Sequence, residues 1–141
     1  MEDRIYREIV DTAPDAILFA DREGIIRLWN AGAEAIFGYP AAEALGRSLD
    51  LIIPERLRAR HDEGYRQVMG GRPSRYGHDL LCVPAVTREG GQISTEFSIV
   101  LVRDDRGEAQ GVAAIMRDVS VRRQQEKTLK EELAALKSAA G

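Results

Sequence analysis

Short apolar runs alternate with turn-forming residues along most of the chain, a pattern typical of strands and short helices. Residues 16–20 and 25–29 are strand-like, and residues 21–24 between them have the composition of a hairpin turn. Three further strands are predicted over residues 76–86, 93–102 and 111–117. The pattern therefore predicts five strands, with the first two paired as a hairpin.

Helical spacing occurs in the segments between and before these strands. Residues 1–13 have the apolar spacing of a short amphipathic helix that stops before Pro14. Asn30 is a good N-cap, so we expect a helix over residues 31–37, whose small side chains would let it lie close to the sheet. Two more helices are predicted, over residues 41–45 and from Pro54 to Met69.

The order of two strands, several helices and three strands favours an α+β fold, with an antiparallel sheet and short helices on one face. After residue 119 the chain becomes rich in charged residues and keeps one apolar stripe, formed by Leu129, Leu133 and Leu136. The stripe is shorter than a sustained heptad seam. It indicates either a helix that packs on its own domain or frays, or an output helix that pairs with a second copy. We divide the chain into an N-terminal cap helix (1–13), a core (14–118) and a C-terminal helix (119–141).

Composition narrows the classes of protein to consider. The 141 residues carry a net charge of −3, which gives no basic field for nucleic acid. No apolar stretch is long enough to cross a bilayer, and the N-terminus lacks the apolar run of a signal peptide. We therefore expect a soluble, cytoplasmic domain without nucleic-acid or membrane partners. The single cysteine, Cys82, excludes an internal disulfide and is expected to be a buried strand thiol.

Six short motifs, such as Trp-Asn-Ala-Gly-Ala-Glu at 29–34, follow one another along the chain, at residues 21–26, 29–34, 37–39, 42–47, 88–90 and 117–120. Each is weak alone, but together, in register over residues 3–121, they resemble the PAS domain, a ligand-sensing and dimerising signal module. The resemblance implies a five-stranded antiparallel sheet and a helical flank that enclose a ligand cavity. It also implies an exposed ion pair between Glu43 and Arg88, worth on the order of 0–1 kcal/mol.

The resemblance makes His61 the most testable residue. In haem-binding PAS oxygen sensors, a Pro-x-x-x-Arg-x-x-His segment supplies the proximal iron ligand, and residues 54–61 match that spacing. Tyr65 and Met69, on the same predicted helix, also fit those sensors. The similarity therefore implies haem b as a cofactor. The alternative is a partly exposed histidine on a helix face, because many PAS domains without known haem carry a similar residue.

The same resemblance implies a pocket between this helix and the inner faces of the last three strands. Three apolar strand residues would line it: Ile99, Leu101 and Met116. Such residues are more often core than cofactor contacts. His78 would be the sixth iron ligand in a six-coordinate site, whereas strand alternation would point it to solvent. Leu80 or Leu81 stands where the oxygen-sensing haem kinases have a gas-binding arginine. If haem binds, this difference from those kinases favours the sensing of carbon monoxide, nitric oxide or redox state over the sensing of oxygen.

Residues 118–120 resemble the family's junction between the last strand and a signalling helix. Asp118 or Ser120 can cap that helix through its side-chain oxygen. The resemblance implies more than a cap, namely a hinge whose hydrogen bonds change when the sheet is perturbed. Both interpretations assign these two residues to the start of the C-terminal helix.

Catalysis by this chain is not expected. The His-Asp dipeptides at His61 and His78 lack the further histidines of a metal phosphohydrolase, and Cys82 lies too far along its strand from His78 for a nucleophile pair. Gly-rich phosphate loops and histidine-kinase catalytic elements are missing. The Asn-Cys-Arg-Phe-Leu motif of the flavin-binding light sensors, another PAS subfamily, is also absent.

The sequence therefore predicts a sensory domain that binds a small ligand or cofactor and relays the change to its C-terminal helix. Haem b on His61 is the cofactor named by the resemblance, and an unidentified ligand or none are the other outcomes. We expect a homodimer and a downstream effector domain or partner protein. The alternative is a cofactor-free PAS module for dimerisation or protein interaction.

Overall fold

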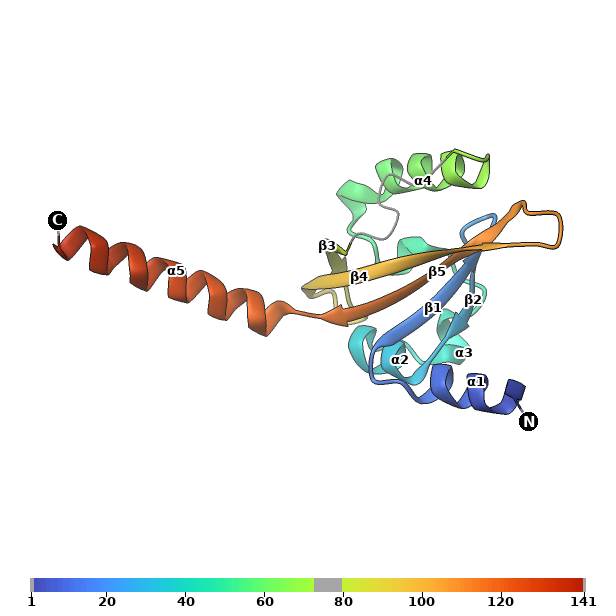
Figure 1. The fold of residues 1–141 in the computed structure, drawn as a ribbon, viewed down its shortest axis with the longest axis horizontal. Coiled ribbons are helices and arrows are strands. Elements are labelled where there is room, and N and C mark those ends of the chain that lie inside the picture. Colours follow the sequence, from blue (N-terminus) through green and yellow to red (C-terminus); the bar gives the residue numbers. More distant parts are fainter. Residues whose placement is uncertain (1, 73–79, 141) are drawn as a thin grey trace.

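The computed structural model describes residues 2–72 and 80–140, and its centre is a five-stranded antiparallel sheet (Figure 1). The strands lie in the order β2-β1-β5-β4-β3, so the two halves of the chain meet where β1 pairs with β5. Their bounds are β1 (Ala16–Asp21), β2 (Ile26–Trp29), β3 (Leu81–Val86), β4 (Gln92–Arg103) and β5 (Ala109–Asp118). The predicted α+β fold is confirmed.

Helices precede, interrupt and follow the strands. They are α1 (Glu2–Thr12), α2 (Ala31–Phe37), α3 (Ala41–Ala44), the 3-10 helix η1 (Leu49–Ile52), α4 (Glu55–Met69) and α5 (Ser120–Ala140). The helices predicted after Asn30 and Pro54 are confirmed, with Pro54 at the N-cap of α4. Proline suits this position because the first N–H groups of a helix have no partner inside it.

The third strand is shorter than its sequence pattern indicated. β3 begins at Leu81, where its ladder with β4 starts opposite Phe97. Leu80 precedes the strand, so the prediction that placed it in the strand is wrong. The rest of the predicted extension, residues 76–79, lies outside the described residues. An apolar run shows strand propensity, but the pairing partner decides where a ladder ends.

Asn30 joins three elements at the start of the sheet. The residue is 3% exposed, and its Oδ1 accepts hydrogen bonds from the N–H groups of Ala33 at 2.9 Å and Ile17 at 2.8 Å. Its Nδ2 donates to the carbonyl oxygens of Val10 at 2.8 Å and Asp15 at 3.0 Å. The predicted N-cap is confirmed, and the same side chain also fixes the ends of α1 and β1.

The core lies between the inner face of the sheet and helices α2, α3 and η1. Ile26 and Phe37 are fully buried, and the rings of Phe37 and Trp29 lie 5.5 Å apart. α2 comes so close to the chain before β1 that a Cβ on Gly32 would lie 2.1 Å from the carbonyl oxygen of Asp15. The expectation that small residues bring this helix close is therefore confirmed.

Cys82 is exposed, so the prediction of a buried thiol is wrong. It lies opposite Glu96 on the edge strand β3, and the neighbouring Ala85 faces the core from the alternate side. Nη1 of Arg123, in the first turn of α5, lies 3.1 Å from the Cys82 Sγ. Alternation separates the two faces of a strand, but it does not show which face the rest of the fold covers.

Glu43 and Arg88 form the predicted ion pair, with Nη1 of Arg88 3.1 Å from Oε2 of Glu43. Both side chains are largely exposed, so the expected contribution to stability remains about 0–1 kcal/mol. The backbone N–H of Arg88 also donates to the carbonyl oxygen of Phe37 at 2.9 Å. These contacts attach the β3–β4 hairpin turn to the end of α2 and to α3.

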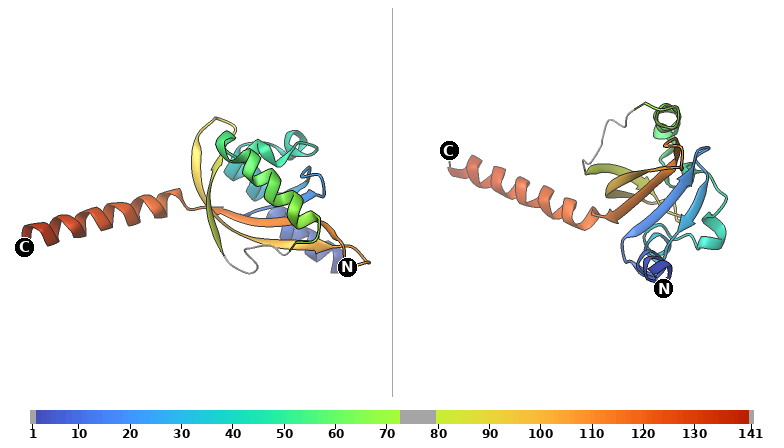
Figure 2. Two further views of the ribbon diagram at one scale, coloured as in Figure 1. Left: turned by 90° about the horizontal axis from the view of Figure 1, so that it is seen from above. Right: turned by 45° about the vertical axis from the view of Figure 1, so that its right-hand side comes forward.

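α5 extends away from the rest of the domain (Figures 1 and 2), and none of its residues is buried. Beyond its first turns, the helix does not pack on its own domain. This outcome contradicts the expectation that the leucine stripe packs on its own domain. Across the described residues, no helix combines the length and hydrophobicity needed to cross a membrane.

Candidate functional site

α4, the helix that carries His61, crosses over the sheet (Figure 2, left), with Met69 as its only buried residue and Tyr65 packed against the core. The Tyr65 hydroxyl reaches the carbonyl oxygens of Asp21 at 2.6 Å and Ala20 at 3.0 Å, at the end of β1. Burial raises the pKa of Tyr65 to about 12. The hydroxyl therefore remains a neutral donor at physiological pH.

Arg22, in the turn between β1 and β2, makes the second attachment of α4. Its guanidinium donates to the carbonyl oxygen of Met69 at 3.2 Å and also to that of Ala109, the first residue of β5. A cation is favourable at this place because the last carbonyl groups of a helix carry partial negative charge. One side chain thus joins the end of α4 to the start of β5. No sequence pattern signalled this role, since the contacts span 47 and 87 residues.

His61 and Tyr65 lie on the same side of α4, with ring centroids 5.9 Å apart. The His61 side chain is 37% exposed, yet its Nδ1 is enclosed and has no hydrogen-bond partner among residues 2–72 and 80–140. The carboxylate of the adjacent Asp62 lies 3.9 Å from Nδ1, beyond hydrogen-bond distance. Buried polar atoms without a partner are uncommon in native proteins, so this nitrogen marks a candidate ligand contact.

Burial lowers the pKa of His61 below its ordinary value, and the charges of Asp62 and Asp50 partly oppose that shift. The imidazole is therefore neutral at neutral pH, which is the form that binds metals. Asp50 lies in η1, and its Oδ1 is also enclosed, without a hydrogen-bond partner among the described residues. Sequence reasoning missed Asp50, because no motif links it to His61.

The predicted lining residues of the sheet occupy different environments. Ile99 and Met116 belong to the hydrophobic core or pack against it, while Leu101 is half-buried on the same face, opposite Val112. The structure does not bring Leu80 to this face, since its side chain is 63% exposed. His78 lies outside the described residues, so its predicted role as a sixth ligand stays a prediction.

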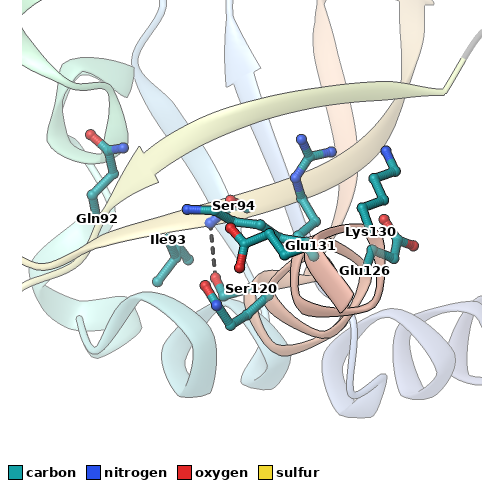
Figure 3. Close-up of a pocket in the computed structure, with 10 residues that line it drawn as sticks. Gln92, Ile93, Ser94, Ser120, Glu126, Lys130 and Glu131 are labelled. Atoms are coloured by element: carbon teal, nitrogen blue, oxygen red, sulfur yellow. Dashed lines mark hydrogen bonds between the residues drawn. The ribbon is translucent and has the colours of Figure 1, made fainter. Parts of the chain in front are cut away.

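Two surface grooves lie along the terminal helices of the described chain, and His61 lines neither of them. One, of about 510 Å³, runs between the start of β4 and the first half of α5 (Figure 3). The other, of about 350 Å³, lies between α1 and Leu28 of β2. Both grooves follow terminal helices at the rim of the sheet.

β5 passes into α5 through hydrogen bonds that also involve β4. Oδ1 of Asp118 accepts from the N–H of Ser120 at 2.9 Å, so Asp118 is the residue that caps the helix. The Ser120 hydroxyl accepts instead from the N–H of Ser94 at 2.9 Å (Figure 3), and the N–H of Val119 donates to the carbonyl oxygen of Ser94 at 2.8 Å. The helix is thus fixed to β4 as well as to β5.

Arg122 strengthens this junction from the first turn of α5. Its guanidinium pairs with the carboxylate of Glu96 on β4 and lies 3.6 Å from that of Glu126. The hydrogen bond from Arg122 lowers the pKa of Glu96. The sequence did not predict these contacts, because they depend on how β4 lies beside the start of α5.

The PAS fold family model matches residues 10–124. This chain belongs to the PAS family. It is 33% identical over 120 residues to the methanogenesis regulatory histidine kinase FilI of Methanothrix harundinacea. That match covers 85% of this chain and 13% of FilI. It is 27% identical over 124 residues to the oxygen sensor protein DosP of Escherichia coli, covering 86% of this chain and 15% of DosP. The chain therefore spans less than a sixth of the length of either relative.

Solved structures agree with the assignment of the fold. The PAS domain of a protein from Colwellia psychrerythraea superimposes with a TM-score of 0.74 at 19% identity, covering 85% of this chain and 98% of that domain. The resemblance inferred from the six short motifs is thereby confirmed for family and fold. It identifies a PAS sensory domain, related to domains of kinases and oxygen sensors.

Proposed function

We propose that this PAS domain senses a ligand held beneath α4, and that the ligand is haem b bound through His61. The observation that carries the proposal is the enclosed Nδ1 of His61, which has no hydrogen-bond partner in the part of the chain that the structure describes. A single imidazole is sufficient protein ligation for haem iron, because the porphyrin supplies the equatorial ligands. The similarity to DosP, an oxygen sensor protein, supports the proposal.

The residues around His61 fit such a group. Burial keeps the imidazole neutral, and the apolar inner face of the sheet, with Met116 and Ile99, suits a porphyrin. The charge of Asp50 acts on His61, and a carboxylate that accepts the second ring N–H is the kind of group that orients metal-bound histidines. Bound haem would supply an iron centre for gas or redox sensing. The chain's own residues would hold it and set its orientation.

The proposed output runs through the junction at Asp118 and Ser120 into α5. Its support is the set of hydrogen bonds that ties the first residues of α5 to β4 and β5. A ligand shifts such a junction only if it binds two arrangements of the domain with different affinity. The proposed receivers are a second copy of this chain and a downstream effector domain, in keeping with a relative that is a histidine kinase.

A second candidate function is a cofactor-free module for dimerisation or protein interaction. The exposed leucine residues of α5 favour it, as do the two open grooves, which lie beside α1 and α5 and away from His61. The two functions differ in whether His61 binds a cofactor. They share the use of α5 as an interaction element.

A haem titration of the full chain separates them. We expect added haem b to give a saturable Soret band with the unchanged protein and with Tyr65→Phe, and no such band with His61→Ala. His78→Ala serves as the matched control and should keep the band. Absence of the band from the unchanged protein, or an undiminished band in His61→Ala, would refute haem binding through His61. Loss of the band in His78→Ala alone would assign the ligand to His78 instead.

A further inference from the structure

The two ends of α4 are attached to the domain in different ways. At the N-terminal end, Pro54 and Ile52 are buried and Ile53 packs against the hydrophobic core. Nε of Arg58, in the first turn of α4, donates to the carbonyl oxygen of Ile53 at 3.0 Å. Apolar packing therefore fixes this end of the helix to η1 and to the core.

The C-terminal end of α4 depends mainly on hydrogen bonds to backbone carbonyl oxygens. The Tyr65 hydroxyl reaches that of Asp21 at 2.6 Å, and the guanidinium of Arg22 donates to those of Met69 and Ala109. Arg22 is exposed, so water competes for its two bonds. Met69 is the only buried residue of the helix. This end, near the β4–β5 hairpin (Figure 1), is therefore the more weakly held one.

The last turn of α4 explains why an arginine holds it. The N–H groups of residues 70–72 turn back to the carbonyl oxygens of residues 66–68, and Arg22 donates to the next one, that of Met69. Carbonyl groups at the end of a helix carry partial negative charge, which favours a cation there. The planar guanidinium also donates in two directions at once, unlike a lysine ammonium. Arg22 can therefore hold the helix end and the start of β5 together.

Releasing this end of α4 is a much smaller change than unfolding. It would expose Met69 and break the contacts of Arg22 and Tyr65, while the ladders of the sheet stay paired. Openings that break few buried contacts have the lowest free energies in a native protein, so they occur far more often than global unfolding. Such an opening matters for ligand entry, because Nδ1 of His61 is enclosed and a ligand reaches this atom only after its surroundings move.

We propose that α4 is a lid over the ligand site, with its hinge at Pro54 and Arg22 as its latch, and that the ligand enters and leaves when the latch opens. The inference rests on the proposed ligand site beneath α4 and adds the way into it. Arg22 is a positioning residue in this role, because it contacts the helix and not the ligand. A weaker latch would speed entry and release together.

Thiol labelling of the full, haem-free chain tests the latch without a ligand. In a Cys82→Ser background, Met69→Cys places a reporter under the latched end of α4. Leu49→Cys places a second reporter in the core near the hinge, where the native side chain is 9% exposed. When labelling is slow relative to closing, its rate follows the population of the open form. Arg22→Gln should therefore label Met69→Cys about tenfold faster and leave Leu49→Cys unchanged.

Two further variants control this measurement. Arg103→Gln is the matched control and should change neither rate, because Nη1 of Arg103 donates to the carbonyl oxygen of Gly107 at 2.8 Å, within the β4–β5 turn. Arg22→Lys keeps the charge but loses the planar fork, so it should give a smaller increase than Arg22→Gln. An unchanged rate at Met69→Cys, or the same increase at Leu49→Cys in both Arg22 variants, overturns the proposal.

Stopped-flow mixing with haem b tests the effect on entry. Because opening precedes both binding and release, the two rate constants should rise by similar factors in Arg22→Gln, about tenfold, while Kd changes less than about threefold. A higher Kd with an unchanged association rate overturns the role in entry. Thiol labelling needs no haem, so it would still test the latch if haem did not bind. A failed latch would in turn leave the equilibrium haem titration as expected.

Discussion

Asn30 provides the sharpest test of how the fold is fixed, because one side chain serves both as acceptor and as donor. Asn30→Asp keeps the shape and the two accepted hydrogen bonds, from Ala33 and Ile17. It replaces the donating Nδ2 by an oxygen that faces the carbonyl oxygens of Val10 and Asp15. The variant therefore isolates the donor function of a buried amide.

The expected cost follows from these bonds. Two lost hydrogen bonds contribute about 1 kcal/mol each, and a buried charge facing carbonyl oxygens adds to this, so Asn30→Asp should lose about 3 kcal/mol or more at pH 7. Asn30→Ala instead leaves two N–H groups without partners, at about 1–3 kcal/mol each. We expect both variants to lose a large part of the stability of a domain of this size, which is typically about 5–15 kcal/mol.

Urea unfolding followed by circular dichroism at pH 7 and pH 4 measures the effect. The surrounding carbonyl groups raise the pKa of the new carboxyl group in the folded state, so the folded form binds more protons than the unfolded form. Relative to the unchanged protein, Asn30→Asp should therefore be least stable at pH 7 and recover as the pH falls, whereas Asn30→Ala should not. Gln110→Glu, the same chemical change on an exposed side chain, is the control. An Asn30→Asp loss below about 1 kcal/mol at pH 7 would refute the donor role.

Three further predictions concern the packing of helices. Gly32→Ala should destabilise the domain by about 2–3 kcal/mol in urea unfolding, because its Cβ would lie 2.1 Å from a backbone carbonyl oxygen. Gly64→Ala is the control: its Cβ would meet open space beside α4, so it should stabilise the domain by about 0.5–1 kcal/mol. Tyr65→Phe should cost about 1 kcal/mol through its lost hydrogen bond, while the exposed Tyr6→Phe should be neutral by the same assay. Burial lowers the pKa of His61 below 6.5, so its contribution to stability is present above that pH and is lost as the pH falls. The thermal midpoint of the unchanged protein should therefore drop more between pH 7 and pH 5 than that of His61→Gln; equal drops would contradict the burial of this ring.

Local signals in the sequence predicted much of the fold. Asn30 as a cap and the turn before Ile25 are determined by residues adjacent in the chain, so propensity and turn chemistry identify them. Strand identity was also predictable, but the extent and covered face of β3 were not. Leu80 and Cys82 were misplaced because the length and the covered face of an edge strand depend on which elements pair with it and pack on it.

The candidate site was predictable only in part. His61 and Tyr65 share a helix face by simple spacing, so the sequence identified them together. Asp50 and Arg22 were missed, because each acts on α4 from another element. Arg122 was missed for the same reason at the other end of the domain. Long-range polar contacts leave no periodic pattern in a single sequence.

These missed contacts connect the proposed site to the proposed output. Arg22 bonds to the end of α4 and to the start of β5, and β5 runs from Ala109 to Asp118, which caps α5. The connection is continuous, but continuity alone does not establish energetic coupling. Coupling requires that a ligand near His61 changes the free energy of the Arg22 contacts. A displacement of α4 that broke the bond to Met69 while keeping the bond to Ala109 would change only one end of the connection. Signalling through this route would therefore require the contacts of Arg22 as well as a ligand at His61.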